Sequence, residues 1–274
     1  MVVKIKNILL TFDIEEFDMP IEFGMEISDE EIFERSFTGT KRILELVNSK
    51  NIIATFFITP RFAMRYPKLI KEISKKHEVA LHGYHNHNYN YKVVERERAH
   101  KELKSGRDKL RKITGKEVKG FREPRLQKPP YSILKKVGFG YDSSLNPTFV
   151  PGRYNNLFAN RGVQTIEGVK IIPLSVTPLF RLPLFWFAFR NLGLKYGKFV
   201  TKLSLINQDF VVLVFHSWEF IDLNEFKVPL LLRRNSCAKI RNMLSDYIDW
   251  CLKKKWKFIS MGEYYEKNLN NGSL

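Results

Sequence analysis

Short apolar runs typical of buried β-strands alternate with helical stretches along almost the whole chain. When helices connect successive buried strands, the strands run parallel in one sheet or barrel and the helices pack outside it. The sequence therefore predicts an α/β fold built on a parallel sheet or barrel. The expected strands are 8–12, 52–58, 78–81, 118–121, 141–143, 169–173, 210–215 and 257–259.

Four longer segments have the apolar spacing of amphipathic helices. At the start of the first, Ser28 and Glu31 have the spacing of a capping box. No repeat, low-complexity linker or domain boundary interrupts the chain, so we expect one domain over 1–274 with an aromatic insertion around 175–200. The expected helices are 29–49, a segment that begins at Pro67, 93–113 and 237–254.

The charge of the chain is strongly unbalanced, with 46 Lys and Arg against 29 Asp and Glu, a net charge of +17. Such an excess favours polyanions or anionic lipid surfaces. The cations are spread along the chain without a nucleic-acid-binding motif. We therefore expect a phosphate-bearing substrate or an anionic membrane face, and no nucleic acid. The aromatic segment 177–190 either faces the core or dips into lipid headgroups.

Several features bear on the compartment. No apolar run reaches the ~18 residues of a spanning helix, and Met1 leads into the first strand without a secretory signal. Cys237 and Cys251 fall in one expected helix, about 21 Å apart, which is too far for a disulfide. The sequence therefore predicts a cytoplasmic protein, with the inner face of the membrane as a possible place of action.

Polar side chains follow two of the expected strands. The first strand ends in Asp13-Ile14-Glu15, and alternation along a strand points both carboxylates the same way. The run 79–81 leads into His82-Gly83-Tyr84-His85-Asn86-His87. The carboxylates alone could be a solvated strand end, but together with imidazoles at a second strand end they are the ligand set of a catalytic metal. We expect a divalent metal, with zinc as the first choice.

Five motifs occur in a fixed order along the chain, and together they resemble the polysaccharide deacetylases of carbohydrate esterase family four, the NodB type. The resemblance extends from Thr11 to His216. It implies a distorted (β/α) barrel with about seven strands and metal-dependent removal of an N-acyl group, acetyl or formyl, from an amino sugar. The motifs are Thr11-Phe12-Asp13-Ile14-Glu15, His82-Gly83-Tyr84-His85-Asn86-His87, Gly120-Phe121-Arg122-Glu123-Pro124-Arg125, Tyr141-Asp142-Ser143-Ser144 and Leu213-Val214-Phe215-His216.

The resemblance implies catalytic roles for four residues. Asp13 is expected to be the general base that deprotonates the attacking water, and Arg122 the partner that holds Asp13 ionised. His216 is expected to be the general acid, with Asp142 as the carboxylate that keeps His216 charged. Amide hydrolysis needs such an acid, because an amine anion is a very poor leaving group.

The expected metal ligands are Glu15, His82 and His87. The second histidine of the family motif falls on Asn86 here, with His85 and His87 on either side. His87 is our preferred third ligand, reached through a one-residue bulge. His85, the amide oxygen of Asn86, and a site that binds metal poorly are the alternatives.

Two residues are expected to bind substrate. Arg125 stands where the family commonly has tyrosine, and its guanidinium would add a phosphate or carboxylate contact. Trp218 follows His216 closely and could pack on the apolar face of a sugar. A solvent-facing Arg125 and a Trp218 that packs within its loop are the alternatives.

The sequence therefore predicts a metal-dependent hydrolase that deacylates an amino sugar of a lipid-linked or nucleotide-linked glycan precursor. The expected partners are an amino-sugar glycan or glycolipid and an anionic membrane. A metal-independent hydrolase of a small non-sugar amide is the first alternative. The second is a catalytically silent carbohydrate- or lipid-binding barrel, against which the joint presence of Asp13, Arg122, Asp142 and His216 argues.

Overall fold

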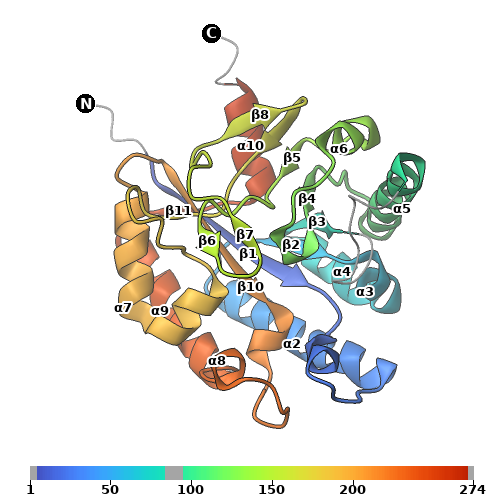
Figure 1. Cartoon of the computed structure of the whole chain (residues 1–274), viewed down its shortest axis with the longest axis horizontal. Helices are drawn as coiled ribbons and strands as arrows, with labels where there is room; N and C mark the ends of the chain where they lie inside the picture. The colour runs from blue at the N-terminus through green and yellow to red at the C-terminus, as the bar shows by residue number, and fades with distance from the viewer. Residues whose placement is uncertain (1–4, 84–94, 271–274) are drawn as a thin grey trace.

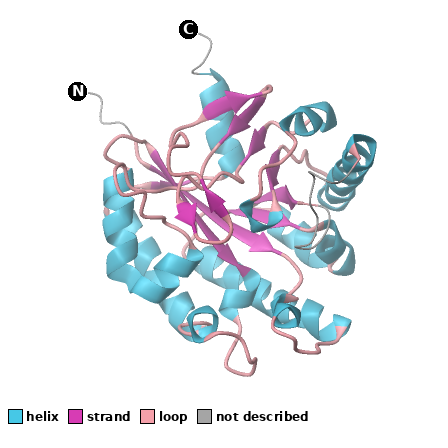
Figure 2. Ribbon diagram, in the orientation of Figure 1, coloured by secondary structure: helices cyan, strands magenta, loops and turns pink. Residues whose placement is uncertain are grey.

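The computed structural model describes residues 5–83 and 95–270. Within them, seven parallel strands run in the order β10-β1-β2-β3-β4-β5-β9 and curl into a half-barrel (Figures 1 and 2). This confirms the predicted α/β barrel of about seven strands. The strands are β1 (Asn7–Ile14), β2 (Thr55–Ile58), β3 (Glu78–His82), β4 (Gly120–Arg122), β5 (Tyr141–Asp142), β9 (Val169–Ile171) and β10 (Phe210–His216).

The two ends of this strand run are joined by hydrogen bonds rather than by a full ladder. The backbone N–H of Val212, on β10, donates to Oγ of Ser175 at 2.9 Å, and the N–H of Ser175 donates to the carbonyl of Val212 at 3.4 Å. The edge of the sheet is extended by β8 (Gln164–Ile166), which pairs antiparallel with β9. A short strand, β11 (Lys257–Phe258), pairs with the start of β1.

The helices lie around the outside of the sheet (Figure 1). Helix α2 begins at the predicted residue, where Oγ of Ser28 accepts a hydrogen bond from the N–H of Glu31 at 3.1 Å. The helices are α1 (Met19–Glu22), α2 (Asp29–Ser49), α3 (Pro60–Arg65), α4 (Pro67–Ser74), α5 (Arg96–Thr114), α6 (Tyr131–Val137), α7 (Trp186–Ser204), α8 (Leu230–Arg233), α9 (Ala238–Lys253) and α10 (Met261–Asn270), with 3-10 turns η1 (Pro124–Leu126) and η2 (Ser217–Phe220).

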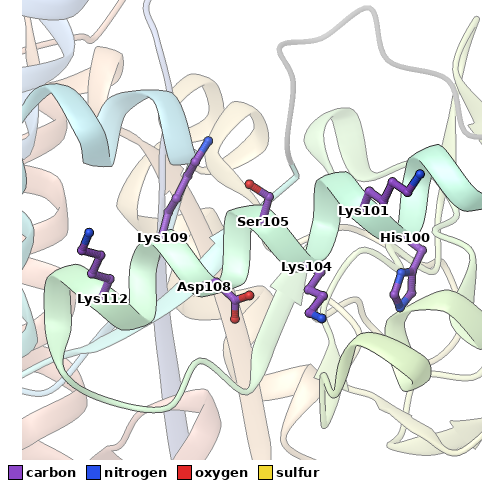
Figure 3. A pocket seen from close by; sticks show the side chains of 7 residues that line it. All are labelled: His100, Lys101, Lys104, Ser105, Asp108, Lys109 and Lys112. Atoms are coloured by element: carbon purple, nitrogen blue, oxygen red, sulfur yellow. The ribbon is translucent and has the colours of Figure 1, made fainter.

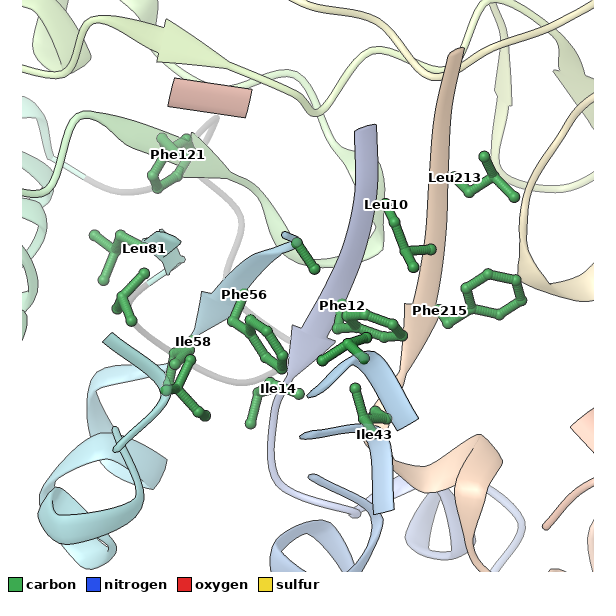
Figure 4. Packing of buried hydrophobic residues seen from close by; sticks show 14 of the residues in the cluster. Leu10, Phe12, Ile14, Ile43, Phe56, Ile58, Leu81, Phe121, Leu213 and Phe215 are labelled. Atoms are coloured by element: carbon green, nitrogen blue, oxygen red, sulfur yellow. The ribbon is translucent and has the colours of Figure 1, made fainter. Parts of the chain in front are cut away.

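Alternation along the strands separates a packing face from a chemical face. On β1, Leu10, Phe12 and Ile14 are buried in the core between the sheet and the helices (Figure 4). The intervening residues Thr11 and Asp13 therefore point to the inside of the half-barrel. The carboxyl ends of the parallel strands all reach the same edge of the sheet, so inward polar residues at these ends come together there.

The aromatic segment 177–190 has two parts in the structure. Its first part is a small hairpin, closed by pairing of Val176 with Pro183, at whose tip Leu179 and Phe180 are 84% and 80% exposed. Its second part begins α7, from which Phe189 is fully buried against the sheet. The two interpretations of this segment, core packing and an exposed apolar surface, thus apply to different residues.

Buried His77 makes the stability of the fold depend on pH. Its Nε2–H donates to Oδ1 of Asn48 at 3.2 Å, and burial together with the Lys76 charge lowers the pKa of His77 to about 4. Between pH 6.5 and 4 the unfolded chain therefore binds a proton that the folded chain does not, so stability falls as pH falls through this range.

We predict that lowering the pH from about 7.5 to 5 costs the wild type about 1 kcal/mol more stability than His77→Gln, measured by urea unfolding. The variant His100→Gln is the control, because His100 lies partly exposed on α5. Equal pH dependence in the wild type and His77→Gln would contradict this assignment.

Candidate active site

Arg122 is the fully buried cation at the centre of the site. From the end of β4, its Nη1 donates to Oδ1 of Asp13 at 2.7 Å and to Oγ1 of Thr11 at 2.8 Å. Its Nε and Nη2 donate to the carbonyl and the hydroxyl of Ser143, both at 3.0 Å. The guanidinium also lies 4.1 Å from the ring centre of Phe57 on β2. Arg122 therefore joins four strand ends and makes the contact with Asp13 that the sequence predicts.

His82 and Glu15 face each other beside Asp13. The carbonyl of Arg122 can only accept a hydrogen bond, so Nδ1 of His82, 3.1 Å away, carries the proton. In the neutral ring Nε2 then presents its lone pair to Oε2 of Glu15 at 3.2 Å. Two electron-pair donors that face each other need a proton or a cation between them. A backbone carbonyl that fixes the far nitrogen is also the usual support of a metal-binding histidine.

His216 completes the cluster from the end of β10, which pairs with β1 so that His216 lies opposite Asp13. Its Nε2 is 3.9 Å from Oδ2 of Asp13 and 3.9 Å from Oε1 of Glu15. Its Nδ1 lies 3.3 Å from Oε1 of Glu219, which also accepts the backbone N–H of His216 at 2.8 Å. Burial alone would lower the pKa of His216, but the hydrogen bond to Glu219 and the charges of Glu15, Asp13 and Glu219 outweigh it and raise the pKa above 6.5.

The expected pairing of Asp142 with His216 is wrong, because Asp142 lies on the other face of the sheet. On β5, Tyr141 points inward, where its hydroxyl donates to Glu78 at 2.8 Å, so the next side chain points outward. Asp142 accepts from Oγ of Ser144 at 2.5 Å, and on α6 burial, with the charge of Asp142 as a smaller cause, raises the pKa of Tyr131. Burial raises the pKa of Asp142 itself to about 7.

Glu219 takes the place that we assigned to Asp142, and sequence reasoning missed its role. It lies three residues after His216 on the turn η2, fully buried, with Oε2 3.7 Å from Nη1 of the equally buried Arg190. The spacing from His216 was a usable signal, because residues three apart on one helical turn lie on the same side. Arg190 belongs to α7, and no local pattern connects it with η2.

Two indole rings fix the position of His216. Trp218 stacks on the imidazole with ring centres 4.9 Å apart, and Trp186 meets it edge to face at 5.4 Å. The Nε1–H of Trp218 also donates to Oε1 of Glu15 at 3.4 Å. Trp218 was predicted to bind substrate, and the structure adds that it orients two site residues. The sequence motifs did not identify Trp186 as a site residue.

A glycine on α2 allows the turn after His216 to lie against that helix. A Cβ atom on Gly39 would be 2.0 Å from the carbonyl oxygen of Ser217, the first residue of η2. Any side chain at Gly39 would therefore displace η2, and with it Glu219 and Trp218. The requirement comes from close approach, because Gly39 itself has ordinary helical geometry.

The site opens into a cavity of about 300 Å³. Asp13, Glu15 and His216 lie in its wall. Arg125 also lines it, in the left-handed backbone region with φ of 58°, and forms an ion pair with Glu22 on α1. Arg125 is therefore placed to contact a substrate, as the sequence predicts, and its role stays a prediction.

The third expected metal ligand, His87, lies outside the described residues, as do His85 and Asn86. Within 5–83 and 95–270, no group of three or more His, Cys, Asp and Glu side chains has the arrangement of a metal site. The described part thus supplies two donors, Glu15 and His82, whose chemistry and mutual orientation fit a divalent cation. Their role as ligands stays a prediction.

We predict that Glu219→Gln lowers the pKa of His216 by about one pH unit, because the variant keeps a hydrogen-bond acceptor but loses the charge. The measurement is an NMR titration of the His216 ring in chelator-treated protein. Asp142→Asn is the matched control and should leave this pKa unchanged. A pKa that falls in Asp142→Asn but not in Glu219→Gln would restore the original assignment.

The comparisons with known proteins agree with this geometry. The sequence profile of the polysaccharide deacetylase family matches residues 2–142, slightly more than half of the chain. Over 120 residues the chain is 28% identical to peptidoglycan-N-acetylmuramic acid deacetylase PdaA of Bacillus subtilis. This match covers 43% of the chain and 45% of PdaA, so the chain matches less than half the length of that curated relative.

Two solved structures share the fold over nearly the whole chain. A protein of Mycobacterium smegmatis described as a polysaccharide deacetylase superposes with a TM-score of 0.67 at 17% identity, over 97% of this chain and 91% of that chain. Puue allantoinase superposes with a TM-score of 0.65 at 15% identity, over the same shares. At these identities the likeness establishes the fold alone, and the sequence profile carries the assignment. The chain belongs to the polysaccharide deacetylase family, whose members are hydrolases of amide carbon–nitrogen bonds.

Proposed function

We propose that this protein is a metal-dependent hydrolase that removes an acetyl or formyl group from the nitrogen of an amino sugar. One observation carries the proposal: Oδ2 of buried Asp13 lies 4.0 Å from Nε2 of His82 and 3.9 Å from Nε2 of His216. A base, a cation ligand and an acid thus lie together around one carboxylate oxygen, as amide hydrolysis requires.

Asp13 acts as the base in this proposal. Its Oδ1 is occupied by the Arg122 guanidinium, so Oδ2 is the oxygen that faces the two imidazoles. Oδ2 takes a proton from the water that attacks the amide carbon. Because Arg122 is held by Thr11 and Ser143 as well, the carboxylate of Asp13 stays in one orientation during this step.

His216 acts as the acid. Nδ1–H donates to the Glu219 carboxylate, so in the imidazolium the second proton is on Nε2, the nitrogen that faces Asp13 and Glu15. The carbon–nitrogen bond breaks as Nε2 gives its proton to the departing nitrogen, which leaves as the free amine. The raised pKa of His216 keeps this proton available near neutral pH.

Glu15 and His82 would hold the metal, and deacetylases of this family are generally metal-dependent. When bound, a divalent ion such as zinc polarises the amide carbonyl and lowers the pKa of a bound water to about 7. Trp218 and the carbonyl of Arg122 fix the two donors by hydrogen bonds, so the chain orients both side chains before any ion arrives. His87 remains our candidate for a third ligand.

The proposed substrate is an amino sugar on a lipid-linked or nucleotide-linked precursor, deacylated in the cytoplasm or at the inner face of the membrane. Arg153 and Arg125, the latter ion-paired with Glu22, both line the cavity and carry cationic groups that a phosphate could contact. The net charge of +17 supports an anionic substrate in the same way.

We expect Asp13→Asn and His216→Ala each to lower kcat/KM by about 10²- to 10⁴-fold, because each removes one proton-transfer group. The measurement is acetate or formate release from N-acetyl and N-formyl amino sugars, free and linked to a prenyl or nucleoside diphosphate. Glu16→Gln is the matched control. Glu16 is buried beside Glu15, but its carboxylate accepts a hydrogen bond from Thr59. Removing its charge should therefore change kcat/KM by less than about threefold.

The proposal fails if folded wild-type protein, supplied with zinc, releases no acyl group from any of these substrates. It fails equally if Asp13→Asn retains wild-type activity. Circular dichroism of each variant separates loss of chemistry from loss of fold.

A further inference from the structure

Large exposed apolar side chains gather around the mouth of the cavity. Of the fifteen such residues in the described part of the chain, eight belong to four segments: α1 with its end, residues 149–158 and α8, which line the cavity, and the 176–183 hairpin, which is hydrogen-bonded to the second of these through Thr148. We call these eight the cavity rim. The cavity rim consists of Ile21, Phe23, Phe149, Phe158, Leu179, Phe180, Leu230 and Leu231.

Three of the four rim segments also contribute residues to the cavity wall. Phe23, at the end of α1, both lines the cavity and is 40% exposed. Val150 lines the cavity from the hairpin of β6 (Phe149–Val150) and β7 (Tyr154–Asn155), which lies in front of the barrel in Figure 1. Leu232 lines the cavity from α8, and Phe185 lines it from the position just before α7, two residues after the 176–183 hairpin. The exposed apolar residues therefore border the entrance to the site.

Hydrogen bonds tie these segments to one another. Oγ1 of Thr148, just before β6, donates to the carbonyl of Arg181 at the tip of the 176–183 hairpin at 2.8 Å. Nδ2 of Asn191 on α7 donates to the carbonyl of Leu231 on α8 at 3.0 Å. The 176–183 hairpin and α8 are thus each fixed to a neighbouring segment of the fold.

One part of the rim is basic, whereas the α1 segment carries Asp18, Glu22 and Glu26. Between residues 145 and 185, Glu167 is the single acidic residue of the sequence, against Arg153, Arg161, Lys170 and Arg181. The pKa of Arg161 is lowered by burial and by the nearby charge of Arg181, so like charges lie close together here. Apolar side chains close to cations match the interface of an anionic bilayer. The apolar side chains can insert among the acyl chains, and the anionic headgroups can neutralise the cations.

We propose that the cavity rim docks onto a phospholipid bilayer with anionic headgroups. In the described part of the chain no helix is long and apolar enough to cross such a bilayer. Attachment would therefore be peripheral, with Leu179 and Phe180 inserted most deeply because they are the most exposed pair at one tip. Docking would place the cavity mouth against the headgroup layer.

Docking in this orientation selects a substrate class. An amino sugar carried on a membrane lipid through a phosphate would meet the mouth without leaving the bilayer, and Arg125 and Arg153 at the cavity would face that phosphate. This consequence rests on the proposed function, whereas the docking surface itself does not. A nucleotide-linked sugar would gain nothing from membrane attachment.

A second basic surface provides a control. A hollow of about 570 Å³ runs along α5, lined by Lys101, Lys104, Lys109 and Lys112, with His100, Ser105 and Asp108 (Figure 3). It has cations but lacks large exposed apolar side chains. If bilayer binding were simple charge attraction, this surface would contribute as much as the rim.

The test is co-sedimentation of the full chain with vesicles of phosphatidylcholine that contain about one third phosphatidylglycerol, compared with pure phosphatidylcholine, at about 0.15 M salt. We expect the wild type to bind the anionic vesicles. Leu179→Ser/Phe180→Ser should bind them at least about tenfold more weakly, because this variant loses apolar area without a change of charge. Acyl release from a short water-soluble substrate should be unchanged in this variant.

Two matched variants should bind vesicles like the wild type within about threefold. Phe199→Ser/Ile206→Ser removes two equally apolar, exposed residues from the α7 region outside the rim. Lys104→Gln/Lys109→Gln removes two charges from α5. Equal losses in either variant and in Leu179→Ser/Phe180→Ser would overturn the assignment to the rim.

Other outcomes also overturn the proposal. The first is that the wild type does not bind anionic vesicles. The second is that the wild type forms a concentration-dependent dimer in sedimentation and Leu179→Ser/Phe180→Ser does not. Failure of this inference is distinct from failure of the proposed function. Vesicle binding without acyl release would leave the docking surface standing, whereas acyl release without vesicle binding would leave the hydrolase standing.

Discussion

The buried guanidinium of Arg122 is the interaction on which the rest of the site depends. A cation taken out of water costs several kcal/mol unless its donors are paired with good geometry. Here Thr11, Asp13 and Ser143 take those donors, and they come from β1 and from the turn after β5. The backbone carbonyl of Arg122 also accepts a hydrogen bond from His82. The strand ends can therefore not shift independently, and the base and the first imidazole keep their separation.

A second buried pair extends this order to the acid. Arg190 faces Glu219 at 3.7 Å with both side chains fully buried, and Glu219 holds His216 through its backbone and its ring. Trp186 and Trp218 enclose the imidazole from two sides. Asp13, Glu15 and Glu219, all buried, act together on His216. The pKa of His216 is therefore raised, which favours the charged imidazolium.

How much of this the sequence predicts depends on the length of each element. Strand β1 has eight residues, so its alternation is visible and correctly places Asp13 on the inner face. Strand β5 has two residues, too few to show an alternation, so the pattern could not test the pairing of Asp142 with His216 that the resemblance implied. Glu219 and Arg190 meet only through tertiary packing of α7 on η2, which no local pattern contains. The 176–183 hairpin likewise appears in the sequence only as apolar residues without a period.

The account rests on Glu15 and His82 being metal ligands, and metal content tests this most directly. Mass spectrometry of protein purified without chelator and dialysed against trace zinc should find about one equivalent of divalent metal. His82→Ala and Glu15→Gln, verified as folded, should each retain a small fraction of it. No metal in the wild type, or full occupancy in both variants, would contradict the account and leave the acid–base groups without the cation we propose.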